Sequence, residues 1–201
     1  MTVIGLTGSI GMGKTTAAAA FRALGIPVHD ADAAVHALLA AGGAGVDAVG
    51  AAFPAALMTE GGKTSIDRKT LGQIVFGDAA EKKKLEDILH PMVRAAGDAF
   101  VAAMHEQGHD LVVLDIPLLF ETGGEKRVDV TLCVTAPPDV QRARVLARDG
   151  MTAERFARIL AGQMPDAEKR RRADYVVTTD KGHDAMRRQL TDIVAKIRAE
   201  S

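Results

Sequence analysis

The sequence has few of the residues that mark several large classes of protein. Its 201 residues include one cysteine, no tryptophan and one tyrosine, and aromatic residues make up only 3%. A lone Cys133 allows neither an intramolecular disulfide nor a cysteine-based zinc site, as expected in a reducing compartment. So few aromatic side chains leave little for the stacking platforms of proteins that bind single-stranded nucleic acid.

Net charge and long apolar runs are also lacking. With 25 basic and 26 acidic residues the formal charge is −1, so no overall field would hold the chain on nucleic acid or an anionic membrane. The first apolar run is too short for a signal peptide and has no basic flank, and no later segment reaches ~18 consecutive apolar residues. We therefore expect a cytoplasmic protein that binds neither nucleic acid nor membrane, and no obligate protein partner is evident.

Strand-like and helix-like segments alternate along the chain. Short apolar runs predict strands at residues 2–7, 26–29, 111–114, 128–135 and 175–177. Helical spacing of apolar residues predicts helices at 14–24, 67–76, 78–106, 137–148, 152–163 and 183–198. Residues 42–62, rich in glycine and alanine, predict a short helix and loops rather than a sheet strand. The alternation predicts an α/β fold, a three-layer sandwich around a parallel sheet with ligands at the carboxyl ends of the strands.

A phosphate-binding motif follows the first predicted strand. Residues 8–15 match the pattern G-x-x-x-x-G-K-[ST] and precede a predicted helix, which is the context that the motif requires. Glycines let backbone amides turn towards a β-phosphate, Lys14 reaches the β and γ oxygens, and the Thr15 hydroxyl can ligate Mg²⁺. We predict that ATP is bound by the loop and the residue after it, namely Gly8, Ser9, Ile10, Gly11, Met12, Gly13, Lys14, Thr15 and Thr16.

The loop alone leaves the destination of the phosphate open. A GTP switch should carry a guanine-reading N-K-x-D motif, which the chain lacks. A motor-type ATPase usually places Glu after the acid that ends its hydrolytic strand, whereas Asp115 is followed by Ile116. Transfer to a bound small molecule is therefore favoured, and a nucleotide-dependent binding switch stays the alternative.

Two carboxylates end the second predicted strand, in the run Asp30-Ala31-Asp32. One could accept the proton of an acceptor hydroxyl, and the other could hold the metal's water or the acceptor. The alternative is a helix N-cap followed by an acid in the first turn. Because Asp32 falls in the first helical turn, we assign it as the base and Asp30 as an orienting group.

Several basic residues have both a functional and a structural interpretation. Arg144 and Arg148 stand four apart in a predicted helix, so they could close over the triphosphate as a lid, or simply form a solvated face. The basic run at residues 169–172 is expected mainly to serve solubility, and the alternative is that one or two of its members turn towards phosphate. His90, next to Pro91 in a predicted helix, is on local grounds a structural or capping residue.

Taken together, seven motifs resemble dephospho-coenzyme A kinase, in that family's order and over nearly the whole chain. They are Thr7–Thr15, Asp30-Ala31-Asp32, Leu89-His90-Pro91, Pro117-Leu118-Leu119-Phe120-Glu121, Arg144 with Arg148, Gln163 and Ala173-Asp174-Tyr175. The resemblance implies ATP-dependent phosphorylation of the ribose 3′-hydroxyl of dephospho-coenzyme A with Mg²⁺, the last step of coenzyme A synthesis. Another small-molecule kinase of the same fold is the remaining enzymatic alternative.

The resemblance also implies an organisation and a set of residue roles. It implies a single P-loop kinase domain with a core at about 1–41, 108–136 and 173–201, a helical acceptor-binding insertion at about 42–107 and a lid at about 137–165. Lys14, Asp32 and Arg144 would be catalytic, and Thr15 would bind the metal. The substrate side would comprise Asp30, Asp32, His90, Pro117, Leu118 and Leu119. The family often has an Asn-containing turn near the last strand, where this chain has Thr178-Thr179-Asp180-Lys181-Gly182.

Overall fold

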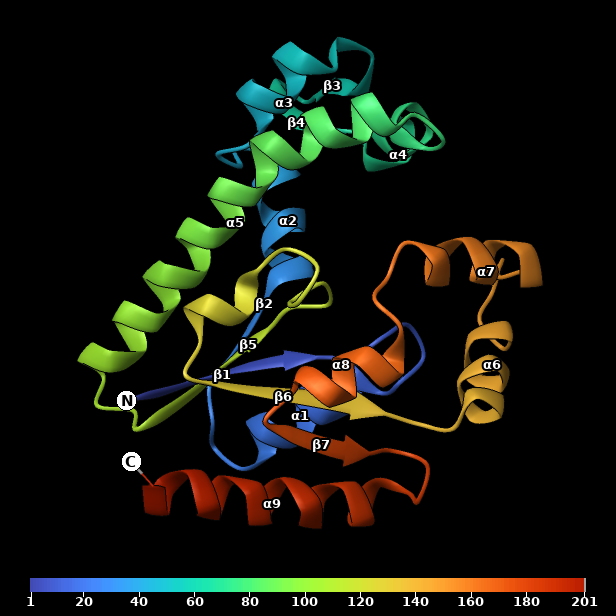
Figure 1. Cartoon of the computed structure of the whole chain (residues 1–201). Coiled ribbons are helices and arrows are strands. Elements are labelled where there is room, and N and C mark those ends of the chain that lie inside the picture. Colours follow the sequence, from blue (N-terminus) through green and yellow to red (C-terminus); the bar gives the residue numbers. More distant parts are fainter. Residues whose placement is uncertain (201) are drawn as a thin grey trace. The chain divides into compact units, whose positions relative to one another are not determined.

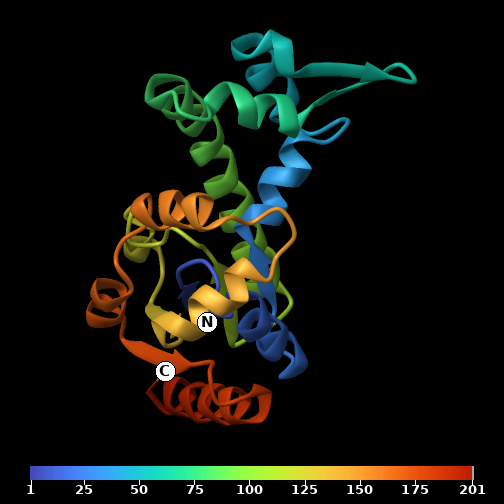
Figure 2. The same cartoon turned by 90° about the vertical axis from the view of Figure 1, so that its right-hand side faces the viewer.

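A computed structural model describes residues 1–200 (Figures 1 and 2). The chain divides into two compact units. The first comprises Met1–His29 together with the chain from Val101 onward, and the second comprises Asp30–Phe100.

The first unit is built on a five-stranded sheet with the strand order β2-β5-β1-β6-β7. Its strands are β1 (Thr2–Thr7), β2 (Val28–Asp30), β5 (Leu111–Asp115), β6 (Val130–Thr135) and β7 (Tyr175–Thr178). β1 pairs in parallel with both β5 and β6, and β6 pairs in parallel with β7. The carboxyl ends of these four strands therefore meet at one edge of the sheet, as the sequence predicts.

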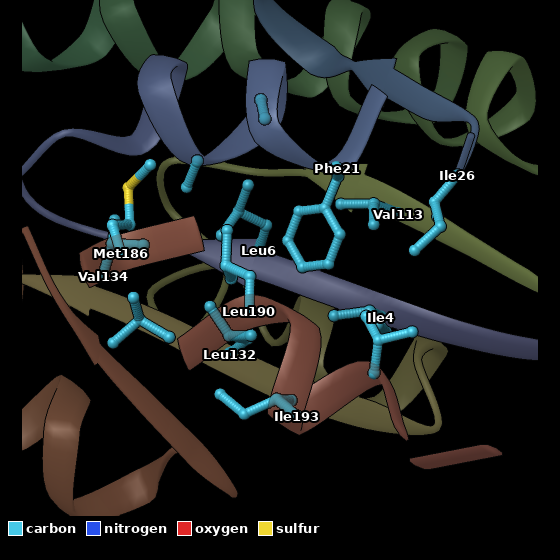
Figure 3. Packing of buried hydrophobic residues seen from close by; sticks show 14 of the residues in the cluster. Ile4, Leu6, Phe21, Ile26, Val113, Leu132, Val134, Met186, Leu190 and Ile193 are labelled. Carbon is cyan, nitrogen blue, oxygen red and sulfur yellow. The ribbon is translucent and has the colours of Figure 1, made fainter. Parts of the chain in front are cut away.

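Helices cover both faces of this sheet. On one face, α1 (Lys14–Ala23) and α9 (His183–Glu200) pack against the strands, and Phe21 lies among Leu6, Val113 and Leu190 in the main core (Figure 3). Cys133 lies between two residues of that core, so its side chain points to the opposite face. There its thiol is close enough to Asp166 and Lys169 on α8 (Asp166–Arg172) to be influenced by their charges. The predicted three-layer α/β arrangement is confirmed.

The buried thiol of Cys133 gives a first testable prediction. Its side chain has no exposed surface, and burial raises the pKa of the thiol to about 12. Because the thiolate is the reactive form, the folded protein at pH 8 holds almost none of it. We expect no reaction with Ellman's reagent in native buffer and complete reaction of the one thiol in guanidinium chloride. Rapid labelling of the native protein would show that this face of the sheet opens readily.

Three shorter helices complete the first unit. They are α6 (Pro138–Leu146), α7 (Ala153–Ala161) and α8, and a 3₁₀ turn, η2 (Gly124–Arg127), precedes β6. The helix α8 was not predicted from the sequence. Its acidic first turn and basic last turn complement the helix dipole, which stabilises this seven-residue helix.

The second unit has a smaller core of its own. Its elements are α2 (Ala31–Leu39), α3 (Val46–Ala52), η1 (Pro54–Ala56), β3 (Leu57–Glu60), β4 (Lys63–Ile66), α4 (Arg68–Val75) and α5 (Ala79–Glu106) as far as Phe100. Buried residues such as Val49, Phe53 and Leu89 form its core. The helix α5 runs continuously through Pro91. Within residues 1–200, no helix is both long and apolar enough to cross a membrane.

The prediction that residues 42–62 contain no strand is wrong. β3 and β4 pair as an antiparallel hairpin, joined by Gly61 and Gly62. Both glycines have positive φ, at 57° and 77°, which is what a two-residue type I′ turn requires and what other residues rarely adopt. The Gly-Gly pair was the available signal for this hairpin.

Candidate functional site

The predicted phosphate loop lies between β1 and α1, at the carboxyl edge of the sheet. Gly13 caps α1 with a φ of 92°, a left-handed conformation that a side chain would disfavour. At Gly8 a Cβ atom would lie 2.5 Å from Val134 Cγ2 and 2.8 Å from the Val134 carbonyl oxygen, so no side chain fits. The motif glycines are therefore required both by backbone conformation and by packing against β6.

Lys14, the first residue of α1, is held at this edge by a carboxylate. Its Nζ lies 2.5 Å from Oδ1 of Asp115, the last residue of β5, and the two side chains are 15% and 3% exposed. β5 lies directly beside β1, so the pairing follows from the sheet order. Asp115 was not among the site residues expected from the sequence, yet its carboxylate contacts the lysine most characteristic of the motif.

Polar side chains from distant parts of the chain hold the loop itself. Gln141 on α6 donates from Nε2 to the Ile10 carbonyl oxygen at 2.7 Å, and Gln163 Oε1 accepts from the Ile10 N–H at 3.1 Å. Arg144, also on α6, donates from Nη1 to the Gly11 carbonyl oxygen at 3.5 Å. The segment predicted as a lid is therefore hydrogen-bonded to the phosphate loop.

The two arginines of that segment have different environments in the structure. Arg144 is half-buried beside the loop, and its guanidinium donates to Thr179 Oγ1 at 2.8 Å and to the Thr179 carbonyl oxygen at 2.6 Å. Arg148 lies two residues beyond the end of α6 and is exposed. Arg144 therefore contacts the loop and Thr179, whereas the Arg148 side chain is exposed.

The Pro117–Glu121 segment follows β5 and is held by hydrogen bonds from β1 and α8. The Pro117 carbonyl oxygen accepts from Thr7 Oγ1 at 3.0 Å and from Lys169 Nζ at 2.9 Å. Lys169 also pairs with Glu121 Oε1 at 2.9 Å, and its side chain is completely buried. The expectation that the 169–172 run serves solubility is therefore wrong for Lys169. Leu119 is fully buried too, so its side chain belongs to the core.

The remaining candidate residues lie in the second unit. Asp30 is the N-cap of α2, and its Oδ1 accepts from the Ala33 N–H at 3.0 Å. This is the capping alternative that the sequence left open. Asp32 lies in the first turn of α2 with an exposed side chain, for which no hydrogen-bond partner occurs among residues 1–200. His90 is half-buried on α5.

A parallel sheet with a glycine-rich loop between strand β1 and helix α1, and with Lys14 as the first residue of α1, is the arrangement found in the P-loop kinases. Solved structures of shikimate kinase share this fold; the enzyme from Bacteroides thetaiotaomicron aligns with a TM-score of 0.51 at 18% identity, over 96% of this chain and 98% of that one. The family profile described as dephospho-CoA kinase matches residues 2–184. The chain belongs to the dephospho-CoA kinase family.

Individual relatives match this chain over nearly their whole length. A dephospho-CoA kinase from Mesorhizobium japonicum is 52% identical over 200 residues, covering 100% of this chain and 98% of the relative. The crystal structure of TT1252 from Thermus thermophilus aligns with a TM-score of 0.80 at 37% identity, over 97% of each chain. The protein is a kinase that catalyses the ATP-dependent phosphorylation of dephospho-CoA, the final step of coenzyme A biosynthesis.

Proposed function

We propose that the reaction is transfer of the γ-phosphoryl group of MgATP to the ribose 3′-hydroxyl of dephospho-CoA in the cytoplasm, with no obligate protein partner. The 3′ oxygen forms a bond to the γ-phosphorus while the bond to the β,γ-bridging oxygen breaks, and ADP leaves. The hydroxyl proton passes to a carboxylate. The observation that carries the proposal is the phosphate loop with Lys14 held at 2.5 Å from Asp115.

At the phosphate side, the residues of the loop and of α1 would provide positive charge. Lys14 would move from Asp115 towards the β and γ oxygens, and the start of α1 adds the partial charge of its dipole. These groups stabilise charge that spreads over the transferring phosphoryl group. Gly8–Thr16 would surround the phosphates, although Met12 does so through its backbone because its side chain is 2% exposed.

The residues present fit a magnesium ion carried by the substrate. Among the described residues, no group of three or more histidine, cysteine, aspartate or glutamate side chains could form a dedicated metal site. Mg²⁺ instead usually binds one or two protein oxygens together with substrate phosphates and waters. The exposed Thr15 hydroxyl and the Asp115 carboxylate are such oxygens. The ion would supply charge neutralisation on the β and γ oxygens.

Replacing Thr15 tests this metal assignment. Thr15→Ala should raise the Mg²⁺ concentration needed for half-maximal rate by about tenfold, equivalent to ~1.4 kcal/mol, because one ligand is lost. Thr15→Ser keeps the hydroxyl and should match the wild type. A magnesium titration at saturating substrates measures both. An unchanged magnesium requirement in Thr15→Ala would remove Thr15 from the metal site.

At the acceptor side, we assign Asp32 as the base that takes the 3′-hydroxyl proton. Its exposed, unpartnered carboxylate in the described chain supports this role, whereas Asp30 is engaged in capping α2. Asp30 would orient α2, and thereby Asp32. His90, Pro117 and Leu118 would contact dephospho-CoA, and Leu119 would support that segment from the core.

Arg144 and Arg148 would act in different ways. Arg144 is already fixed beside the loop, so we assign it to stabilising the phosphates during transfer. The exposed Arg148 would act as the closing residue of the lid. Such closure limits the transfer of phosphate to water.

An acceptor panel tests the proposed function. The purified chain alone should release ADP with dephospho-CoA and Mg²⁺, and should release almost none with shikimate, gluconate or a nucleoside monophosphate. Turnover with one of these acceptors and none with dephospho-CoA would overturn the proposal. A requirement for a second protein would contradict the proposal that the enzyme needs no obligate protein partner.

A further inference from the structure

Thr179 is a buried polar residue that the proposed mechanism does not use. It follows β7 directly, and only 8% of its surface is exposed. Its backbone N–H donates to the Thr135 carbonyl oxygen at 2.9 Å, which extends the β6–β7 pairing by one residue. This backbone bond does not involve the side chain, so the hydroxyl of Thr179 is not needed for the strand pairing.

The hydroxyl of Thr179 joins two parts of the phosphate site. Thr179 Oγ1 lies 2.8 Å from the Met12 carbonyl oxygen in the loop and 2.8 Å from Arg144 Nη1, with the Thr135 carbonyl oxygen at 3.3 Å. A hydroxyl has one hydrogen to donate and two lone pairs, and guanidinium can only donate. Thr179 therefore accepts from Arg144 and donates its one hydrogen towards Met12, the nearer of the two carbonyl oxygens.

Arg144 is bound to Thr179 at two atoms. Besides the bond to the hydroxyl, Nη2 donates to the Thr179 carbonyl oxygen at 2.6 Å. These two bonds fix the plane of the guanidinium, while its 3.5 Å bond to the Gly11 carbonyl oxygen is longer. The position of Arg144 therefore depends on Thr179 more than on the loop itself.

Thr179 also contacts the end of the loop next to Lys14. A Cβ atom on Gly13 would lie 2.9 Å from Thr179 Oγ1 and 3.1 Å from its Cβ and Cγ2 atoms. The side chain thus packs directly against the residue that caps α1. Met12 is anchored on its other side, because its Sδ accepts from the Ala136 N–H at 3.1 Å.

We propose that Thr179 is a positioning residue for phosphoryl transfer, whose hydroxyl couples the phosphate loop at Met12 to the guanidinium of Arg144. This rests on the proposed binding of ATP phosphates by the loop. The hydroxyl holds the loop and the arginine in one hydrogen-bonded network. Both are therefore already in position when the nucleotide binds. Thr179 itself touches no substrate.

The isosteric variant Thr179→Val isolates the hydroxyl. Valine keeps the shape and the backbone bonds, but it leaves the Met12 carbonyl oxygen and one Arg144 N–H without this partner. The KM for ATP should rise by about tenfold, the scale of losing one hydrogen bond to a charged group. The KM for dephospho-CoA should stay within about twofold, because the network lies at the nucleotide side.

Matched variants separate positioning from general stability. Thr179→Ser retains the hydroxyl and should restore the ATP KM. Thr178→Val makes the same change one residue earlier, where the hydroxyl faces Gln189 on α9 instead of the loop, and should leave kinetics unchanged. In a double-mutant cycle with Arg144→Met, the combined loss should be smaller than the product of the single losses, since both remove the same contact.

The outcomes distinguish this proposal from the function on which it rests. An ATP KM in Thr179→Val within about twofold of wild type, a Ser variant as impaired as Val, or multiplicative losses with Arg144→Met would each overturn the proposal. If Lys14→Ala also left turnover intact, the loop's proposed role would fail as well. If Thr179→Val did not fold, Arg144→Met would test the same contact by removing its other partner. An unchanged ATP KM in that variant would overturn the proposed coupling.

Discussion

Lys14→Ala should reduce kcat by about 10²-fold or more, the scale of losing one preorganised charge that stabilises a transition state. The lysine is the side-chain cation of the phosphate loop, and Asp115 holds it at the carboxyl edge of the sheet. As the transferring phosphoryl group loosens, charge builds on its oxygens and on the leaving ADP. Steady-state kinetics with saturating ATP and dephospho-CoA measures the loss.

The structure adds a stability effect to this prediction. Lys14→Ala removes this ion pair from the 97% buried side chain of Asp115, so the melting temperature should fall while the protein stays folded at assay temperature. Lys196→Ala, at an exposed site on α9, is the matched control and should change neither quantity. A folded Lys14→Ala variant with near wild-type kcat would remove the lysine from the mechanism.

Asp32→Asn should lower the rate of dephospho-CoA phosphorylation by roughly 10²-fold, because it keeps the side-chain shape and removes the proposed base. A positioned base contributes typically 10²–10⁴-fold, and a loose transition state keeps the hydroxyl proton until late, which favours the lower end. Calorimetry should find ATP binding almost unchanged. The activity loss and the unchanged nucleotide affinity together define a residue of the acceptor side.

Asp30→Asn is the matched control, two residues earlier in the same run. Asparagine caps helices about as well as aspartate, so the bond to the Ala33 N–H survives and activity should remain close to wild type. The opposite pattern, with Asp30→Asn inactive and Asp32→Asn active, would reverse the two assignments.

The sheet and its covering helices were predictable because each is encoded locally. Buried runs such as Leu111–Asp115 and the apolar stripe of α9 can be recognised within short stretches of sequence. The hairpin of β3 and β4 was missed because its strands have largely exposed side chains and therefore no apolar alternation. The helix α8 was missed because it has acidic residues in its first turn and basic residues in its last turn rather than an apolar face.

The phosphate loop was predictable for the same reason, since its residues are contiguous. Its supports were not, because they come from far along the chain: Asp115 reaches Lys14 across 101 positions, and Thr179 reaches Met12 across 167. Lys169 shows most clearly what sequence reasoning alone could not predict. Within a basic run it resembles a surface residue, and only the fold shows that it is buried against Glu121.

Transfer of the γ-phosphoryl group can be followed directly with ATP carrying ¹⁸O in the three non-bridging oxygens of its γ-phosphate. Mass spectrometry of the product, with fragmentation to locate the phosphate, should find all three labels in a new phosphate on the ribose 3′ oxygen of coenzyme A, with one ADP formed for each product. Labelled inorganic phosphate without a phosphorylated acceptor, or a phosphate at another position, would contradict the proposed reaction.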